Sequence, residues 1–130
     1  MTEEEVAATD AMVNMDTLGL ALPKVWTSHS DKRLSSALAY IGKQLNVPVT
    51  SVNVEQVGNT DSVQFEKRKI PSITIHSLTQ ETWNAHILHS PKDKFSAIRL
   101  EDYYQTYKLV TAYLVFLDQA AGVSAPSSSP

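Results

Sequence analysis

The stretch AMVNMDTLGL, residues 11–20, is the first that could carry chemistry. It is mostly apolar, yet Asn14 and Asp16 lie where a buried strand should carry only hydrocarbon, and Gly19 follows three residues later. An ionised carboxylate is costly to bury unless it is paired or binds a metal. Asp16 therefore has two interpretations: it caps the following loop or pairs with a lysine, or it is a metal ligand at the end of a strand.

A second candidate is HILHSPKDKFSAI, residues 86–98, in which His86 and His89 have the spacing HxxH and Asp93 follows. A neutral imidazole binds zinc, and a nearby carboxylate can orient the second ring nitrogen. The motif is weak by itself, because a polar surface loop with solvated histidines has the same letters. Both interpretations stay open from the spacing alone.

Two further stretches place acidic residues just before predicted helices. In GNTDSVQFEKRKIPSITI, residues 58–75, Asp61 is either an N-cap within a simple strand–helix–strand connection or a residue beside a functional site. His29-Ser30-Asp31 has an HxD spacing that also occurs in metal sites, but its position favours capping, with Ser30 as the expected N-cap.

The elements that must position these residues follow from hydrophobic spacing. The expected strands cover residues 11–16, 20–26, 50–57 and 70–75, the second being weakened by Pro23. The expected helices cover residues 31–45, 62–69 and 100–117, and residues 76–98 are expected to be irregular. The last helix is predicted to form one broad apolar face with Leu100, Tyr103, Tyr104, Tyr107, Val110, Leu114 and Leu117.

Strands that alternate with helices predict an α/β fold with a largely parallel or mixed sheet. In such sheets functional groups gather just beyond the carboxyl ends of strands, where Asp16 lies. We expect one folded unit over residues 1–120 and a disordered Ser/Pro-rich tail over 121–130.

Composition narrows the possible partners of the chain. Its 130 residues carry a net charge of -3, which offers no electrostatic reason to bind nucleic acid or an anionic membrane. The absence of cysteine excludes disulfides, a thiol nucleophile and thiolate metal sites. No apolar run approaches the roughly 18 residues of a membrane span, and MTEEEVAATD has no signal-peptide core.

Three motifs, taken in order, resemble those of the co-catalytic zinc aminopeptidases, a superfamily that includes bacterial leucine aminopeptidases, glutamate carboxypeptidase and glutaminyl cyclase. AMVNMDTLGL resembles the Asn-x-Asp-x-x-Gly strand end of that superfamily. GNTDSVQFEKRKIPSITI resembles its Ser-Asp-x-x-x-Phe-x-x-x-x-Ile-Pro segment, and HSPKDKFSAI resembles its His-Thr-x-x-Asp-x-x-x-x-Ile motif. The resemblance covers roughly residues 6–118 and implies a partial three-layer domain, a mixed β-sheet flanked by helices.

The resemblance also implies roles for individual residues. Asp16 matches a zinc ligand at the carboxyl end of a central strand, and His89 matches the last zinc ligand, which in the family serves a different zinc ion. The residues implied to lie beside the site are Asn14, Asp61 and Asp93. Ser62 stands where the family usually has a histidine.

In that family two zinc ions activate a bridging water, a glutamate acts as general base, and the substrate is the N-terminal residue of a peptide. The His-x-Asp and Glu-Glu motifs that supply the other ligands and the base normally precede the strand of Asp16. Only fifteen residues precede it here, too few to hold them. Because catalytic zinc needs about three protein ligands, we expect weak zinc binding and no peptidase activity from this chain alone.

Three interpretations of function therefore stand side by side. The chain is the C-terminal part of a zinc aminopeptidase-like hydrolase that needs its N-terminal half, a noncatalytic α/β binding module derived from that fold, or a self-associating fragment. A half-sheet should expose a strand edge around Val13, so we expect the chain to pair with itself or swap elements. The family is often secreted or periplasmic, but the compartment and the substrate preference of this chain stay open.

Overall fold

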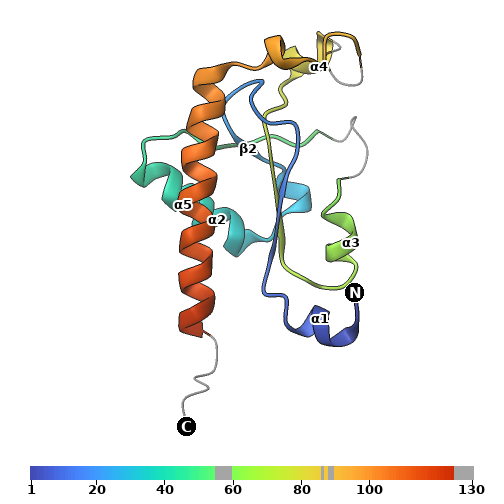
Figure 1. Ribbon diagram of the computed structural model, residues 1–130, viewed down its shortest axis with the longest axis vertical. Coiled ribbons are helices and arrows are strands. Elements are labelled where there is room, and N and C mark those ends of the chain that lie inside the picture. Colours follow the sequence, from blue (N-terminus) through green and yellow to red (C-terminus); the bar gives the residue numbers. More distant parts are fainter. Residues whose placement is uncertain (55–59, 86, 88–89, 125–130) are drawn as a thin grey trace.

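The computed structural model describes residues 1–54, 60–85, 87 and 90–124 (Figure 1). The strands are β1 (Met12–Met15), β2 (Lys24–Val25), β3 (Thr50–Ser51) and β4 (Ser72–His76). The α-helices are α1 (Glu3–Ala7), α2 (Lys32–Gln44), α3 (Val63–Glu66), α4 (Gln80–Asn84) and α5 (Leu100–Ser124). Two short 3-10 helices, η1 (Thr27–His29) and η3 (Phe95–Ala97), complete the described elements.

The four strands form one mixed sheet in the order β1-β4-β2-β3. The central strand β4 is parallel to β1 and antiparallel to β2, and β2 is parallel to β3. Helices α2 and α5 lie on one side of the sheet and α3 lies on the other (Figure 1). The α/β class, the mixed sheet and its flanking helices confirm the expectation, although β1 lies at the edge of the sheet that the described residues form rather than at its centre.

The two faces of β1 and β4 differ in chemistry. Ile73 and Ile75 are fully buried and pack with Val13 and Val25 against α2 and α5, where Leu38, Leu109 and Tyr113 complete the core. Ser72, Thr74 and His76 alternate with them and point to the opposite face, where they are also buried. This period-2 alternation is the pattern that the strand geometry requires.

Helix α2 begins one residue later than expected, because Asp31 and not Ser30 caps it. The Asp31 carboxylate accepts hydrogen bonds from the backbone N–H groups of Arg33 at 2.9 Å and Leu34 at 3.1 Å. Ser30 instead accepts from the N–H of Thr74 at 3.0 Å and donates to the carbonyl of Trp26 at 2.8 Å. The prediction that Ser30 caps α2 was wrong, because the Ser30 hydroxyl instead links η1 to the central strand β4.

The buried face of α5 also differs from the predicted one. Thr106, Leu109, Val110 and Tyr113 are buried. The exposed residues include Leu100, Tyr103, Tyr104, Tyr107 and Leu114, all predicted on the apolar face. From Tyr107 to Leu117 only Lys108 and Thr111 are polar, so the helix is apolar nearly all round and its spacing cannot select the face that packs.

Other boundaries shifted as well. Strand β2 keeps only the end of its predicted range after Pro23, β3 ends at Ser51, and residues 55–57 of its predicted range lie outside the described residues. The stretch expected to be irregular contains α4 and η3. Helix α5 runs to Ser124, into the predicted tail, whose last residues lie outside the description. None of the described helices is both long and apolar enough to span a bilayer.

Candidate functional site

Asp16 directly follows β1 and begins a tight turn. Its backbone N–H donates to the carbonyl of Ile75 at 3.0 Å, and the Thr17 hydroxyl donates to its carboxylate at 2.8 Å. Thr17 has φ 52° and Gly19 has φ 92°, so the chain reverses through left-handed conformations. A Cβ on Gly19 would lie 3.0 Å from Ile98 and 3.2 Å from Tyr103, which explains the glycine.

No lysine or arginine forms an ion pair with Asp16 in the part of the chain that the structure describes. The Thr17 hydroxyl is its recorded side-chain partner, and the carboxylate is only partly buried. The strand-end position that the sequence suggested is therefore observed, without the ion pair that one interpretation invoked. A carboxylate in this position has lone pairs left for a metal.

The turn after β1 is tied to the end of β4. Ser77 donates through both its N–H, at 3.1 Å, and its hydroxyl to the carbonyl of Thr17, and its hydroxyl accepts from the N–H of Leu20 at 3.0 Å. Beside it, His76 is buried and uses both ring nitrogens. Its Nε2 lies 2.7 Å from the Val52 carbonyl, and its Nδ1 accepts from the N–H of Leu78 at 3.0 Å.

These contacts define the protonation state of His76. Since Nδ1 accepts a backbone hydrogen bond, the proton resides on Nε2, and the imidazole is neutral. Burial lowers the pKa of His76 and Lys24 lowers it further, whereas the bond to Val52 and the charge of Asp16 act in the opposite direction. With both nitrogens committed to the backbone, His76 has no lone pair for a metal.

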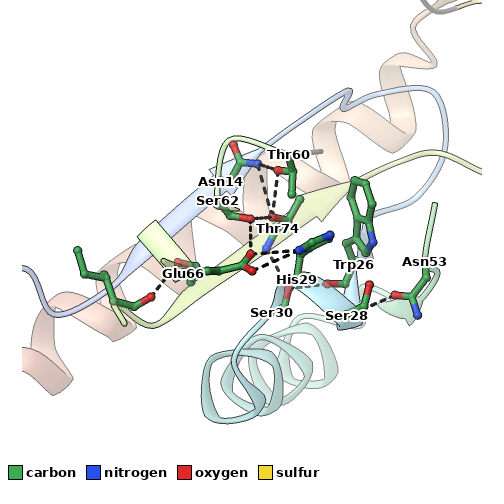
Figure 2. A network of polar contacts seen from close by, with 12 residues as sticks. Asn14, Trp26, Ser28, His29, Ser30, Asn53, Thr60, Ser62, Glu66 and Thr74 are labelled. Atoms are coloured by element: carbon green, nitrogen blue, oxygen red, sulfur yellow. Dashed lines mark hydrogen bonds and ion pairs between the residues drawn. The ribbon is translucent and has the colours of Figure 1, made fainter. Parts of the chain in front are cut away.

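On the polar face of the sheet, a chain of hydrogen bonds crosses from β1 to η1 (Figure 2). Asn14 donates to the hydroxyls of Thr60 and Thr74, and Thr74 donates to Ser62 at 3.1 Å. Ser62 in turn donates to Glu66 at 2.9 Å, and the Glu66 carboxylate lies 3.3 Å from Nδ1 of His29. The ring of His29 meets that of Trp26 edge to face, with centroids 5.0 Å apart.

We call the residues Asn14, Thr60, Ser62, Glu66, Thr74 and His29 the polar network. Among the described residues no buried side-chain nitrogen or oxygen lacks a partner, so every buried polar atom of the network is hydrogen-bonded. Sequence reasoning singled out Asn14, His29 and Ser62 separately but did not connect them to one another. The alternation of Ser72, Thr74 and His76 with isoleucines was the available signal, since it implies a polar face on a buried strand.

Two other predicted site residues, Asp61 and Asp93, are exposed. Asp61 is exposed in the turn before α3 and is not its N-cap; that position belongs to Ser62, whose hydroxyl joins the polar network instead. Asp93 is exposed in a turn closed by its N–H and the carbonyl of Ser90 at 3.0 Å. His86 and His89 lie outside the described residues, so the convergence of His89 and Asp16 stays a prediction.

The described His, Asp and Glu side chains can be compared with the number of ligands that a metal ion needs. Across residues 1–54, 60–85, 87 and 90–124 there is no group of three His, Asp or Glu side chains that could hold a metal ion. His29 is paired with Glu66 and His76 is held by the backbone. The described residues therefore do not form a complete zinc site; at this edge of the sheet they provide the Asp16 carboxylate.

Both the sequence and the fold of the chain match known proteins. Residues 1–114 match the family model of peptidase family M28. The solved structure of LapA from Legionella aligns with a TM-score of 0.71 at 25% identity, covering 83% of this chain and 31% of LapA. BSAP, a zinc aminopeptidase from Bacillus subtilis, aligns with a TM-score of 0.73 at 21% identity, covering 88% of this chain and 29% of BSAP.

No curated protein matches the sequence. The chain spans less than a third of the length of either solved structure, which agrees with the partial domain that the motifs suggested. The family match extends over most of the sequence and includes the strand end at Asp16 and most of the long helix α5. This chain belongs to peptidase family M28.

Proposed function

We propose that the chain is the C-terminal part of a zinc-dependent aminopeptidase-like hydrolase that removes N-terminal residues from peptides. In this proposal Asp16 and His89 are zinc ligands, and the chain alone binds zinc weakly and has no peptidase activity. The observation that carries the proposal is the family match over residues 1–114 in a chain that spans about 30% of its solved relatives.

The position of Asp16 supports its role as a ligand. The carboxylate follows the edge strand β1, and the turn behind it is held by Gly19 and by the Ser77 contacts to Thr17. A ligand on a rigid strand end costs little conformational entropy when a metal binds. The Thr17 hydroxyl, which donates to the carboxylate at 2.8 Å, would orient the oxygen that it contacts.

The incomplete donor set supports the proposed inactivity. Hydrolysis at a zinc centre requires about three protein ligands and a base to take the proton from water. The described residues offer no cluster of three donors, and the Glu-Glu motif that provides the base in the family does not occur before Asp16 with room for a strand between them. An N-terminal half of the domain would supply both.

A second candidate is a noncatalytic α/β module derived from the same fold. The polar network favours it, because Asn14, Thr60, Ser62 and Thr74 are buried and bond to one another, which stabilises that face of the sheet by itself. The coding region upstream distinguishes the two candidates. An in-frame segment that encodes His-x-Asp and Glu-Glu motifs supports the hydrolase, and a true start at Met1 supports the module.

Calorimetric titration with zinc tests the ligand assignment. We expect weak binding by the 130-residue chain and a further loss in Asp16→Ala and His89→Ala. Glu4→Ala removes an exposed carboxylate on α1 and should bind zinc as the unmodified chain does. Binding that is unchanged in both site variants would overturn the assignment, and turnover of an aminoacyl p-nitroanilide by the isolated chain would overturn the proposed inactivity.

A further inference from the structure

The short strand β1 has the sequence MVNM, in which Asn14 is the polar residue. The Asn14 side chain is buried and lies directly opposite Thr74 on β4. Its amide nitrogen donates to the hydroxyls of Thr60 and, at 3.5 Å, Thr74 (Figure 2). Burying an amide costs free energy that an apolar side chain would not cost, and only its hydrogen bonds offset that loss. The strand therefore buries a group that hydrophobic packing does not require.

The apolar side chains of β1 do not determine by themselves how the strand aligns with β4. In the observed register Val13 lies opposite Ile73. If β1 moved two residues toward the end of β4, Val13 would lie opposite Ile75 instead. Ala11 would then face Ile73, so an apolar contact would replace an apolar contact. Because side chains alternate with period two, hydrophobic packing excludes a shift by one residue but permits a shift by two.

The backbone contacts at the end of β1 are equally tolerant of such a shift. The N–H of Asp16 donates to the Ile75 carbonyl, and the Ser77 hydroxyl donates to the Thr17 carbonyl. Every residue offers a carbonyl and, unless it is proline, an N–H, so these bonds do not select one register. A side chain particular to one position of the strand does distinguish the registers, and within β1 the Asn14 amide is that group.

Each register shifted by two residues places an unsuitable group among the buried hydroxyls of Thr60, Ser62 and Thr74. A shift toward the end of β4 brings Met12 opposite Thr74, and its thioether has no donor and is a weak acceptor. The opposite shift brings Asp16 opposite Thr74 and buries an ionised carboxylate, which is costlier still. The observed register places the amide there, and its nitrogen donates to two of the hydroxyls.

We propose that the Asn14 amide fixes the register of β1 against β4 and thereby positions Asp16, which follows two residues later on the same face of the strand. A buried polar side chain that is satisfied in one alignment makes that alignment unique, as single buried asparagines do in coiled coils. The importance of placing Asp16 rests on the proposed function, whereas the selection of the register does not.

The displacement that the amide prevents is large for a functional side chain. Two residues of a strand span about 7 Å, at roughly 3.3 Å per residue. A functional group must keep its position to within about 0.5 Å. A chain in a shifted register would therefore remove Asp16 from any site that the observed register forms, although its core would still be apolar. Asn14 is in this sense a positioning residue and not a ligand.

Nuclear magnetic resonance of the 130-residue chain measures the register without zinc. In the unmodified chain the amide proton of Asp16 should show cross-strand Overhauser contacts at Ile75, whose carbonyl it bonds. Asn14→Leu keeps the approximate size of the side chain and removes the amide, so a second set of contacts, shifted by two residues along β4, should appear. Met12→Leu changes the same face of the strand without removing a hydrogen bond and should keep the single set.

A second variant guards against a failure of Asn14→Leu to fold. Thr60→Val removes the hydroxyl that accepts from the amide and leaves the sequences of β1 and β4 unchanged, so it should also produce the shifted contacts. A single register in Thr60→Val and in any folded Asn14→Leu chain would overturn the proposal, even if urea unfolded them more easily, because the amide would then stabilise the sheet without selecting its alignment. Shifted contacts in Met12→Leu would overturn it too.

These outcomes are independent of the zinc titration. A single register in the variants together with zinc binding that is lost in Asp16→Ala would reject the role of Asn14 and leave the ligand assignment standing. Shifted contacts together with zinc binding that is unchanged in Asp16→Ala would reject the ligand assignment and leave the register role standing.

Discussion

The two faces of the β1–β4 strand pair are covered by different kinds of contact. On one face Val13, Ile73 and Ile75 pack against α2 and α5. On the other, the polar network joins the same strands to α3 and η1 through directional hydrogen bonds (Figure 2). Hydrogen bonds saturate once every donor and acceptor is paired, whereas apolar packing does not. The buried polar atoms of one face are therefore all paired among the described residues, whereas apolar side chains beside the other face, such as Met15 and Leu114, stay exposed.

Because burial of apolar side chains is the main favourable contribution to folding, we expect the apolar face to provide most of the free energy of folding. Ile73→Ala should lower the free energy of unfolding by about 2–5 kcal/mol, because Ile73 is fully buried and its truncation leaves a cavity. Urea unfolding followed by circular dichroism measures the loss. A loss smaller than that caused by Thr74→Val on the polar face would reverse the ranking of the two faces.

Thr74→Val should cost less, about 1–3 kcal/mol, in the same measurement. Valine keeps the shape and burial of Thr74 but removes the hydroxyl that donates to Ser62 and accepts from Asn14. The buried Asn14 amide and Ser62 hydroxyl then lose a partner. Thr111→Val, at an exposed position on α5, is the matched control and should be nearly neutral. An equal effect of both variants would mean that the network contributes nothing specific.

The smallest effect on the free energy of unfolding near neutral pH should come from the protonation of His76. Its pKa in the folded chain lies below the ordinary 6.5, because burial disfavours the cation. The unfolded chain therefore binds the proton more readily than the folded chain does. The contribution of His76 to stability is complete above the unfolded pKa of 6.5 and falls as the pH drops toward the folded pKa.

Unfolding free energies measured from pH 7.5 down to about 5 test this dependence. His76→Gln keeps a donor for the Val52 carbonyl and removes the titrating group, so its stability should vary less over that range. A variant that loses stability as steeply as the unmodified chain would show that other groups cause the dependence.

The sequence by itself determined much of the architecture. The apolar run before Asp16, the buried run before His76 and the helical spacing after Asp31 led to β1, β4 and α2. The family motifs led to the co-catalytic zinc aminopeptidases, which the match to peptidase family M28 confirms. These signals are local, since strand alternation, helix period and cap chemistry depend on neighbours in the chain. The position of Asp16 at a strand end could be predicted for the same reason.

Only the tertiary structure decided the rest. Which side of α5 packs depends on contacts such as the Tyr113 hydroxyl donating to the Leu34 carbonyl at 2.8 Å, 79 residues away. Ser30 does not take its expected capping role because the backbone N–H of Thr74, on the central strand, donates to its hydroxyl. The edge position of β1 follows from which strands pair. Contacts between residues far apart in the sequence determine all three, and hydrophobic spacing along the chain does not reveal such contacts.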